Sequence, residues 1–485
     1  MNITAESLKK INDYCWEIEK GVVSGMRVPG RIFASEKLLE HIVKDDSINQ
    51  VANVATLPGI VKYSFAMPDI HSGYGFPIGG VAATDIEAGG VISPGGIGYD
   101  INCGVRVMRT NLRKHEVVDK MEDIVRALYR KIPVGVGSEG AIHLTEQKLR
   151  QMLEKGARWA VEQGWGSKED LESTESGGCL TDADSNCVSQ RAIKRGLNQP
   201  GTLGSGNHFT EVQYVDTVFD EKTASAFGLE KGSVVIMLHT GSRGLGYQVC
   251  DDYIHSMRNC PEKYGFSIPD RQLVCAPFNS VEGQQYFSAV CAAANYAWAN
   301  RQYLMSLARS AFEQVFNTSY ERLGMNLIYD VAHNIAKVEY YNIDGKQKKL
   351  CVHRKGATRA FPAGHPEVPS KYRSYGQPVL VPGDMGTHSY IMVGTQEAMS
   401  ASFGSVCHGA GRMMSRTASK KSHSYEQVLK ELHDKGVTLM AKGKATVVEE
   451  ASDAYKDIDE VVDAVTGANL AAKVARMTPL GVIKG

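Results

Sequence analysis

The sequence predicts an α+β fold in which helices and short strands do not alternate regularly. Some segments carry apolar positions at helical spacing with few glycine or proline residues, whereas other short apolar runs end at polar loop residues. No Pro/Gly/Ser-rich linker, low-complexity run or long repeat interrupts the 485 residues. We therefore expect one continuous domain over residues 1–485.

The expected elements follow in chain order. The first third is rich in glycine, and turn residues there separate short apolar pieces that predict strands at 80–83 and 90–93. Helical spacing predicts helices over 117–131, 145–163, 282–316, 424–435 and 457–465. Short β-prone runs predict strands at 233–239, 325–331 and 378–381. The last residues, from Leu480 to Gly485, are expected to fray.

Composition restricts the class of protein. Lysine and arginine together number 54 against 54 acidic residues, so no global field draws the chain onto nucleic acid, and any RNA contact must use local patches. No signal peptide and no apolar window of membrane-spanning length occurs, which predicts a cytoplasmic protein without a membrane partner. The ten cysteines lack disulfide-scaffold or paired CxxC spacing, so most are expected to be free thiols.

Five candidate metal ligands stand where apolar runs meet loops. They are Asp100, Cys103, His208, His239 and His333. A lone histidine at a strand end is more often structural, but all of these residues sit among glycines or small residues that permit close backbone approach. Ligand chemistry alone favours zinc. The remaining histidines in charged, helix-like surroundings are expected to be solvated, namely His41, His115, His143 and His433.

Two glycine-rich segments, 382–389 and 407–416, are compatible with binding phosphate. Glycines let successive N–H groups point at one anion, and Arg412 adds a guanidinium fork. No Walker motif is present, and such glycines mark tight turns as readily as phosphate sites. Within the second segment, His408 is a candidate nucleophile, because an imidazole nitrogen can attack a nucleotide α-phosphate. A structural role for a single histidine in a turn remains the alternative.

Local basic clusters border these loops. They comprise Arg191, Lys194, Arg195, Arg243, Arg354, Lys355, Arg359, Lys371 and Arg373. Charge runs are usually solvated faces, yet their position beside the candidate loops also fits a groove that follows a phosphate backbone. Both interpretations stay open at this point.

Five motifs, in this order, carry a resemblance to a known family. They are GGIGYDINCGVR, GTLGSGNHF, HTGSRGLG, HRKGATRA with PGDMGTHSY, and CHGAGRMMSR. The chain resembles the RtcB family of RNA ligases almost from end to end, and its longer form is similar to archaeal members and related bacterial ones. The resemblance implies a single α+β domain whose mixed sheets are surrounded by helices, with a deep cleft for metal and nucleotide.

The resemblance also implies cofactors and residue roles. The same five ligands would hold manganese(II) rather than zinc, as a pair of ions, and GTP would guanylylate His408. Asp69 would position or deprotonate a hydroxyl, and Arg195, Arg243 and Arg412 would contact RNA phosphates and ends. Asp384 stands where the family commonly has a small hydroxyl residue. The residues expected around the guanosine and its phosphates are Asn207, Glu211, Asn334, Asp384, Ser389, Ala410, Gly411 and Lys484. Because Lys484 lies in the tail, bound nucleotide would order these last residues.

The activity implied is the joining of an RNA 3′-phosphate or 2′,3′-cyclic phosphate end to a 5′-hydroxyl end, in tRNA splicing or RNA repair. An archease-like activator is a further expected partner. Two other classes compete with this interpretation: a metal-dependent cyclic phosphodiesterase or phosphatase, and a catalytically idle RNA-binding relative. The first needs neither His408 nor Lys484, and the second would lose ligands that this chain retains.

Overall fold

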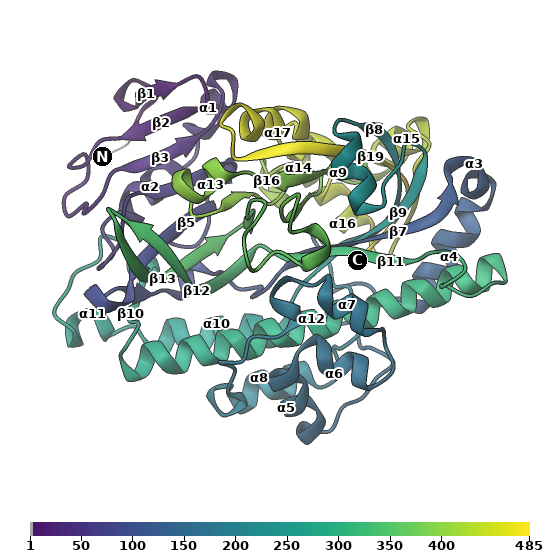
Figure 1. The fold of residues 1–485 in the computed structure, drawn as a ribbon, viewed down its shortest axis with the longest axis horizontal. Coiled ribbons are helices and arrows are strands. Elements are labelled where there is room, and N and C mark those ends of the chain that lie inside the picture. Colours follow the sequence, from purple (N-terminus) through teal and green to yellow (C-terminus); the bar gives the residue numbers. More distant parts are fainter. Residues whose placement is uncertain (1–2) are drawn as a thin grey trace.

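Two large β-sheets form the framework of the protein, whose computed structural model describes residues 3–485 (Figure 1). The N-terminal sheet has the strand order β1 (Lys9–Asn12), β2 (Cys15–Ile18), β3 (Gly30–Phe33), β4 (Ser64–His71), β5 (Ile78–Asp85), β13 (Lys346–Lys355) and β12 (Asn334–Ile343). Because β3 and β4 run parallel while the other neighbours are antiparallel, this sheet is mixed.

The central sheet carries most of the site. Its order is β11 (Asn326–Ala332), β7 (Gly104–Arg113), β9 (Ser233–Thr240), β8 (Phe209–Val218), β19 (Ala471–Lys484), β16 (Ser389–Gly394) and β15 (Pro378–Val381), and β18 (Thr438–Ala441) pairs parallel to β19. Two short ladders join β6 (Val91–Ile92) to β10 (Ala276–Pro277) and β14 (Ala357–Arg359) to β17 (Ser405–Cys407).

Helices pack around these sheets. Those before the longest helix are α1 (Glu36–Ile42), α2 (Ser47–Val54), α3 (Lys114–Val117), α4 (Met121–Lys131), α5 (Glu146–Lys155), α6 (Ala157–Glu162), α7 (Lys168–Glu172), α8 (Gln190–Gly196), α9 (Glu221–Phe227), α10 (Arg243–Ser256) and α11 (Cys260–Lys263). Those from it onward are α12 (Val281–Phe316), α13 (Gln396–Ala401), α14 (Arg416–Ser422), α15 (Tyr425–Asp434), α16 (Lys444–Glu449) and α17 (Ile458–Gly467).

Helix α12 runs along one side of the molecule, with α5, α6 and α8 beyond it (Figure 1). Ser280 caps its N-terminus by accepting a hydrogen bond from the Gly283 N–H at 3.1 Å, and Asn317 ends it in the left-handed region. Alanine-rich turns in its middle allow close packing, so most of the helix is buried. No helix within residues 3–485 combines the length and apolar character needed to cross a bilayer.

Strand register explains why distant segments meet at one edge of the central sheet. Gly104, the first residue of β7, pairs with Thr240 at the end of β9 and with Ala332 at the end of β11. Phe209, the first residue of β8, pairs with His239 and with Lys484. Residues just outside these strand ends therefore converge, although more than 380 positions separate the first from the last.

The predicted α+β class is confirmed, with two local corrections. The helix expected over 145–163 is divided into α5 and α6 at Gly156, where φ is +59° and an added Cβ would lie 2.1 Å from a backbone oxygen. The prediction that the tail frays is also wrong, because β19 pairs with β8, β16 and β18, and the side chains of Val482 and Ile483 are buried. Strand pairing orders these last residues.

Candidate active site

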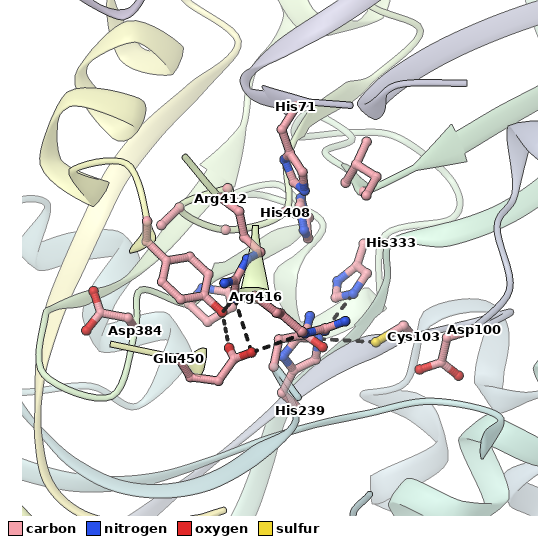
Figure 2. A pocket seen from close by; sticks show the side chains of 18 of the residues that line it. His71, Asp100, Cys103, His239, His333, Asp384, His408, Arg412, Arg416 and Glu450 are labelled. Carbon is pink, nitrogen blue, oxygen red and sulfur yellow. Dashed lines mark hydrogen bonds and ion pairs between the residues drawn. The ribbon is translucent and has the colours of Figure 1, made fainter. Parts of the chain in front are cut away.

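A cavity of about 640 Å³ opens at this edge of the central sheet. Figure 2 shows Asp100 and Cys103 on one side of the labelled His408, His333 and His239, and Asp384 and Glu450 on the other. The predicted site residues that line the cavity are Asp100, Cys103, Asn207, His239, His333, Asn334, Asp384, His408, Ala410, Gly411, Arg412 and Lys484.

The five predicted metal ligands form two overlapping groups. Cys103, His239 and His333 make one, and Asp100, Cys103 and His208 make the other. The Cys103 Sγ lies 3.2 Å from Nε2 of His239 and 3.4 Å from Nε2 of His208. Because the sulfur belongs to both groups, the arrangement fits two cations that share one thiolate.

Burial and hydrogen bonding make these side chains suitable metal ligands. Burial lowers the pKa of His239 and of His333 well below the usual value, so both imidazoles are neutral and their Nε2 atoms lie 3.2 Å apart. The His208 Nδ1–H donates to the Leu203 carbonyl at 3.0 Å, which directs its Nε2 toward Asp100 at 2.9 Å. Burial raises the pKa of the Cys103 thiol, and a bound cation would favour the thiolate.

His408 lies beside this cluster, its ring centroid 4.9 Å from that of His333. The buried Asp69 accepts from the His408 backbone N–H at 2.9 Å and from Nδ1 at 2.5 Å through the same oxygen. Burial alone would raise the pKa of Asp69, but the His408 charge and hydrogen bonds outweigh it and lower the pKa. The carboxylate thus accepts from Nδ1–H and fixes the ring orientation, and Nε2 is the ring nitrogen that does not face Asp69.

The turn after His408 requires glycine at one position. Gly411 has a φ of +75°, and a Cβ there would lie 2.2 Å from the Asp69 carbonyl oxygen. The loop therefore approaches β4 closely enough for Asp69 to reach His408.

At the opposite side of the cavity, Lys484 meets two buried carboxyl groups. Its Nζ lies 3.9 Å from Glu450, and burial lowers its pKa although the charge of Glu450 acts in the opposite direction. Burial raises the pKa of Glu211 to about 8, so this carboxyl group is mainly neutral at pH 7. Glu211 and Ser389 are buried in the wall behind the lining residues, where both accept from the Gln213 amide.

Asp384 lines the cavity, but its own loop already holds the carboxylate. Oδ1 accepts from the Gly386 N–H at 2.9 Å and from the Ser452 hydroxyl at 2.6 Å, and Oδ2 accepts from Thr387 at 2.7 Å. These bonds stabilise the turn of the PGDMG segment. The Asp384 carboxylate therefore organises its own loop and ties it to Ser452.

The basic residues predicted to contact RNA differ in burial and in their partners. Arg243, half-buried at the start of α10, places a guanidinium nitrogen 3.5 Å from Nδ1 of His208, and Arg412 donates to Glu450 at 3.1 Å. Arg195 is exposed on α8. The prediction that Arg354 and Arg359 line a phosphate groove is wrong, because both are buried and paired with Glu339 and Glu367, respectively.

The sequence interpretation missed several residues at the site. His71 lines the cavity with its Nδ1 3.0 Å from the Asp69 carbonyl oxygen. Lys355, predicted only as part of a basic cluster, also lines the cavity, where it donates to two loop carbonyls at 2.9 Å. Lys456 is buried behind Asp69, and Glu450 joins Arg412 to Lys484. His71 stands two positions after Asp69 in a glycine-rich run, a signal that was available. Glu450 and Lys456 lie in ordinary charged sequence, which gave no signal of a role at the site.

The four histidines expected to be solvated are indeed exposed.

Comparison with known proteins gives one consistent result. The family model described as tRNA-splicing ligase RtcB matches residues 50–485. A protein of Thermococcus kodakarensis named tRNA-splicing ligase RtcB is 54% identical over 478 residues, which cover 99% of each chain. Proteins of the same name from Archaeoglobus fulgidus and Methanococcus maripaludis are 53% and 51% identical, again over 99% of each chain.

Proposed function

The chain belongs to the RtcB family, and we propose that it is an RNA ligase that uses GTP to join 3′-phosphate or 2′,3′-cyclic phosphate ends to 5′-hydroxyl ends, in tRNA splicing or repair. The observation that carries this proposal is His408. Its Nδ1 is held by a buried carboxylate, its Nε2 has no hydrogen-bond partner within residues 3–485, and a metal-ligand cluster lies beside it.

Asp100, Cys103, His208, His239 and His333 would hold divalent cations, and we propose a pair of manganese(II) ions. Bound there, cations would neutralise phosphate charge and polarise the reacting phosphorus. Two ions agree with the membership of Cys103 in both ligand groups. Imidazole, thiolate and carboxylate also suit zinc, so the choice of manganese depends on the family resemblance.

In the first step, Nε2 of His408 attacks the α-phosphorus of GTP. An N–P bond forms, the bond from the α-phosphorus to the bridging oxygen breaks, and pyrophosphate leaves. The imidazole gains positive character as the bond forms, and the ionised Asp69 stabilises it through Nδ1–H. We therefore propose that Asp69 acts on the imidazole rather than on an RNA hydroxyl.

The two later steps use RNA. An oxygen of the RNA 3′-phosphate attacks the phosphoramidate phosphorus, so the N–P bond breaks and a phosphoanhydride to GMP forms. The 5′-hydroxyl of the second strand then attacks the RNA phosphorus, and GMP leaves as the new phosphodiester forms. A 2′,3′-cyclic end must first be hydrolysed to the 3′-phosphate.

The remaining residues would bind the nucleotide and the RNA. Lys484 supplies a buried positive charge next to Glu450, and Asn207, Asn334, Ala410 and Gly411 line the cavity around His408. Arg195, Arg243 and Arg412 are proposed to contact RNA phosphates; Arg243 lies nearest the metal ligands. Glu211, Asp384 and Ser389 would shape the guanosine end of the cavity.

The test is mass spectrometry after incubation with GTP and manganese(II). One GMP should be added at His408, labile to acid and stable to base, as a phosphoramidate is. His408→Ala should lose the adduct and the ligation of 3′-phosphate ends, whereas His433→Ala, at an exposed histidine, is the matched control. A label on a lysine, or a normally labelled His408→Ala protein, would contradict the proposed nucleophile.

A further inference from the structure

Three tyrosines form a ladder beside the metal-ligand cluster. Tyr74 comes from the loop between β4 and β5, Tyr99 directly precedes Asp100, and Tyr247 lies on α10. The Tyr74 and Tyr99 ring centroids are 5.8 Å apart, and those of Tyr99 and Tyr247 are 4.7 Å apart with an interplanar angle of 23°. We call this set the tyrosine ladder.

The ladder leads from the cavity to the surface. Tyr74 and Tyr99 line the cavity, whereas Tyr247 is 46% exposed. None of the three hydroxyl groups makes a hydrogen bond within the part of the chain that the structure describes. The exposed Tyr247 ring is not needed to pack α10 against its neighbours. Because this ring stacks on Tyr99, it presents a flat apolar surface that water solvates poorly.

Cations adjoin the outer end of the ladder. The Arg195 guanidinium lies 5.3 Å from the Tyr247 ring centroid and donates to the Gln248 amide oxygen at 2.9 Å. Arg191 and Lys194 are exposed on the same short helix, α8. Within residues 3–485, none of these three cations forms an ion pair. Exposed aromatic surface next to unpaired cations is the combination that binds single-stranded nucleic acid.

We propose that the tyrosine ladder stacks a nucleobase at the end of an RNA strand whose terminus lies at the metal-ligand cluster, while the cations of α8 contact its phosphates. This inference rests on the proposed ligase function. Asp100 links the two sites in sequence, because it follows Tyr99 directly and belongs to the cluster.

The position of the ladder favours an RNA base over the guanine of GTP. Tyr99 adjoins Asp100, and Figure 2 shows Asp100 and Asp384 on opposite sides of His239 and His333. Asp384, one of the residues proposed to shape the guanosine end of the cavity, therefore lies on the other side of the cluster.

The experiment compares Tyr247→Ala with Tyr247→Phe, which keeps the ring, and with Tyr340→Ala, which removes an aromatic ring that is 61% exposed. Tyr340 lies six residues along β12 from Asn334, roughly 20 Å from the cluster. Short single-stranded RNAs carry 2-aminopurine at the terminal nucleotide, next to either a 3′-phosphate or a 5′-hydroxyl. Fluorescence quenching reports stacking on each strand separately.

At least one probe should be quenched by the wild type, by Tyr247→Phe and by Tyr340→Ala, and which probe responds identifies the strand. Tyr247→Ala should abolish the quenching and bind that RNA about 10-fold more weakly, while GMP labelling of His408 stays unchanged. Equal binding and quenching by Tyr247→Ala would overturn the inference. Slower labelling with unchanged RNA binding would also overturn it, by assigning the ladder to GTP. If wild-type protein neither labels nor ligates, the proposed function fails, whereas the quenching result stands separately.

Discussion

Replacing Asp69 by Asn should slow GMP labelling of His408. The Asp69 carboxylate is fully buried and accepts both the backbone N–H and Nδ1–H of His408 through one oxygen. Asparagine has nearly the same shape, and its carbonyl oxygen can still accept both bonds, so the turn is retained. The change removes the negative charge that stabilises the imidazole as the N–P bond forms.

The magnitude follows from that lost charge. A hydrogen bond to a charged partner contributes about 1.5–3 kcal/mol, compared with about 1 kcal/mol for a neutral pair. The difference, about 0.5–2 kcal/mol, corresponds to roughly 2- to 30-fold in rate, since each 1.36 kcal/mol is a factor of ten. The burial of Asp69 places the expected result toward the upper end, because a low local dielectric strengthens the interaction.

The assay is the single-turnover rate of GMP transfer to the protein, followed by the joining of an RNA that already carries a 3′-guanylate. Asp69→Asn should slow the first reaction and leave the second nearly unchanged. If labelling proceeds at the wild-type rate while joining of the activated RNA falls, Asp69 acts on the 5′-hydroxyl, and the role assigned from the Nδ1 contact is refuted. A thermal melt of the variant excludes a general loss of folding.

Three further predictions concern the metal ligands, the tail and one buried carboxyl group. Cys103→Ala should abolish ligation and lower the number of manganese ions bound per chain, measured by equilibrium dialysis, because both ligand groups contain this sulfur; near-normal binding and ligation would contradict the shared-thiolate arrangement. Lys484→Met should raise the GTP concentration needed for half-maximal labelling at least 10-fold, since a charge-assisted phosphate contact is lost; an unchanged requirement would exclude that contact. Glu211 has a pKa raised from 4.5 to about 8, so the unfolded chain binds fewer protons between these values and Glu211 lowers stability as pH rises through this window. Glu211→Gln should therefore gain stability over the wild type between pH 5 and pH 8, as measured by thermal unfolding, and a constant difference would show that Glu211 ionises normally.

The sequence allowed the fold class and the ligand set to be predicted because both depend on local patterns. His239 follows an uninterrupted β-prone run, and His333 follows another, so their positions at strand ends were visible. Whether those strand ends meet depends on the pairing order β11-β7-β9-β8-β19, which no local pattern specifies. The tail was misjudged for the same reason, because its partners lie more than 250 residues earlier in β8.

Charged residues were harder to interpret. Arg354 looked like part of a phosphate groove because nearby acids are few, yet its partner Glu339 lies across the β12–β13 pair and holds it with two hydrogen bonds of 2.6 and 2.8 Å. A buried arginine and an exposed one have the same appearance in sequence when the neutralising carboxylate comes from another strand. Lys456 is the converse case, a buried cation in a segment that looks solvated.

The geometry of the ligand cluster depends on a residue that no motif contains. Arg301, buried in the middle of α12, donates to the Asn102 carbonyl at 2.7 Å and to the Thr240 carbonyl at 2.9 Å, and it pairs with Asp330. Asn102 and Thr240 directly adjoin Cys103 and His239, and Asp330 lies on β11 three residues before His333. One guanidinium thus connects the segments that carry three ligands, and its planar array of donors suits partners in fixed directions. Because a buried pair stabilises little on its own once desolvation is included, we infer that Arg301 serves mainly to align the strand ends on which the metal ligands lie.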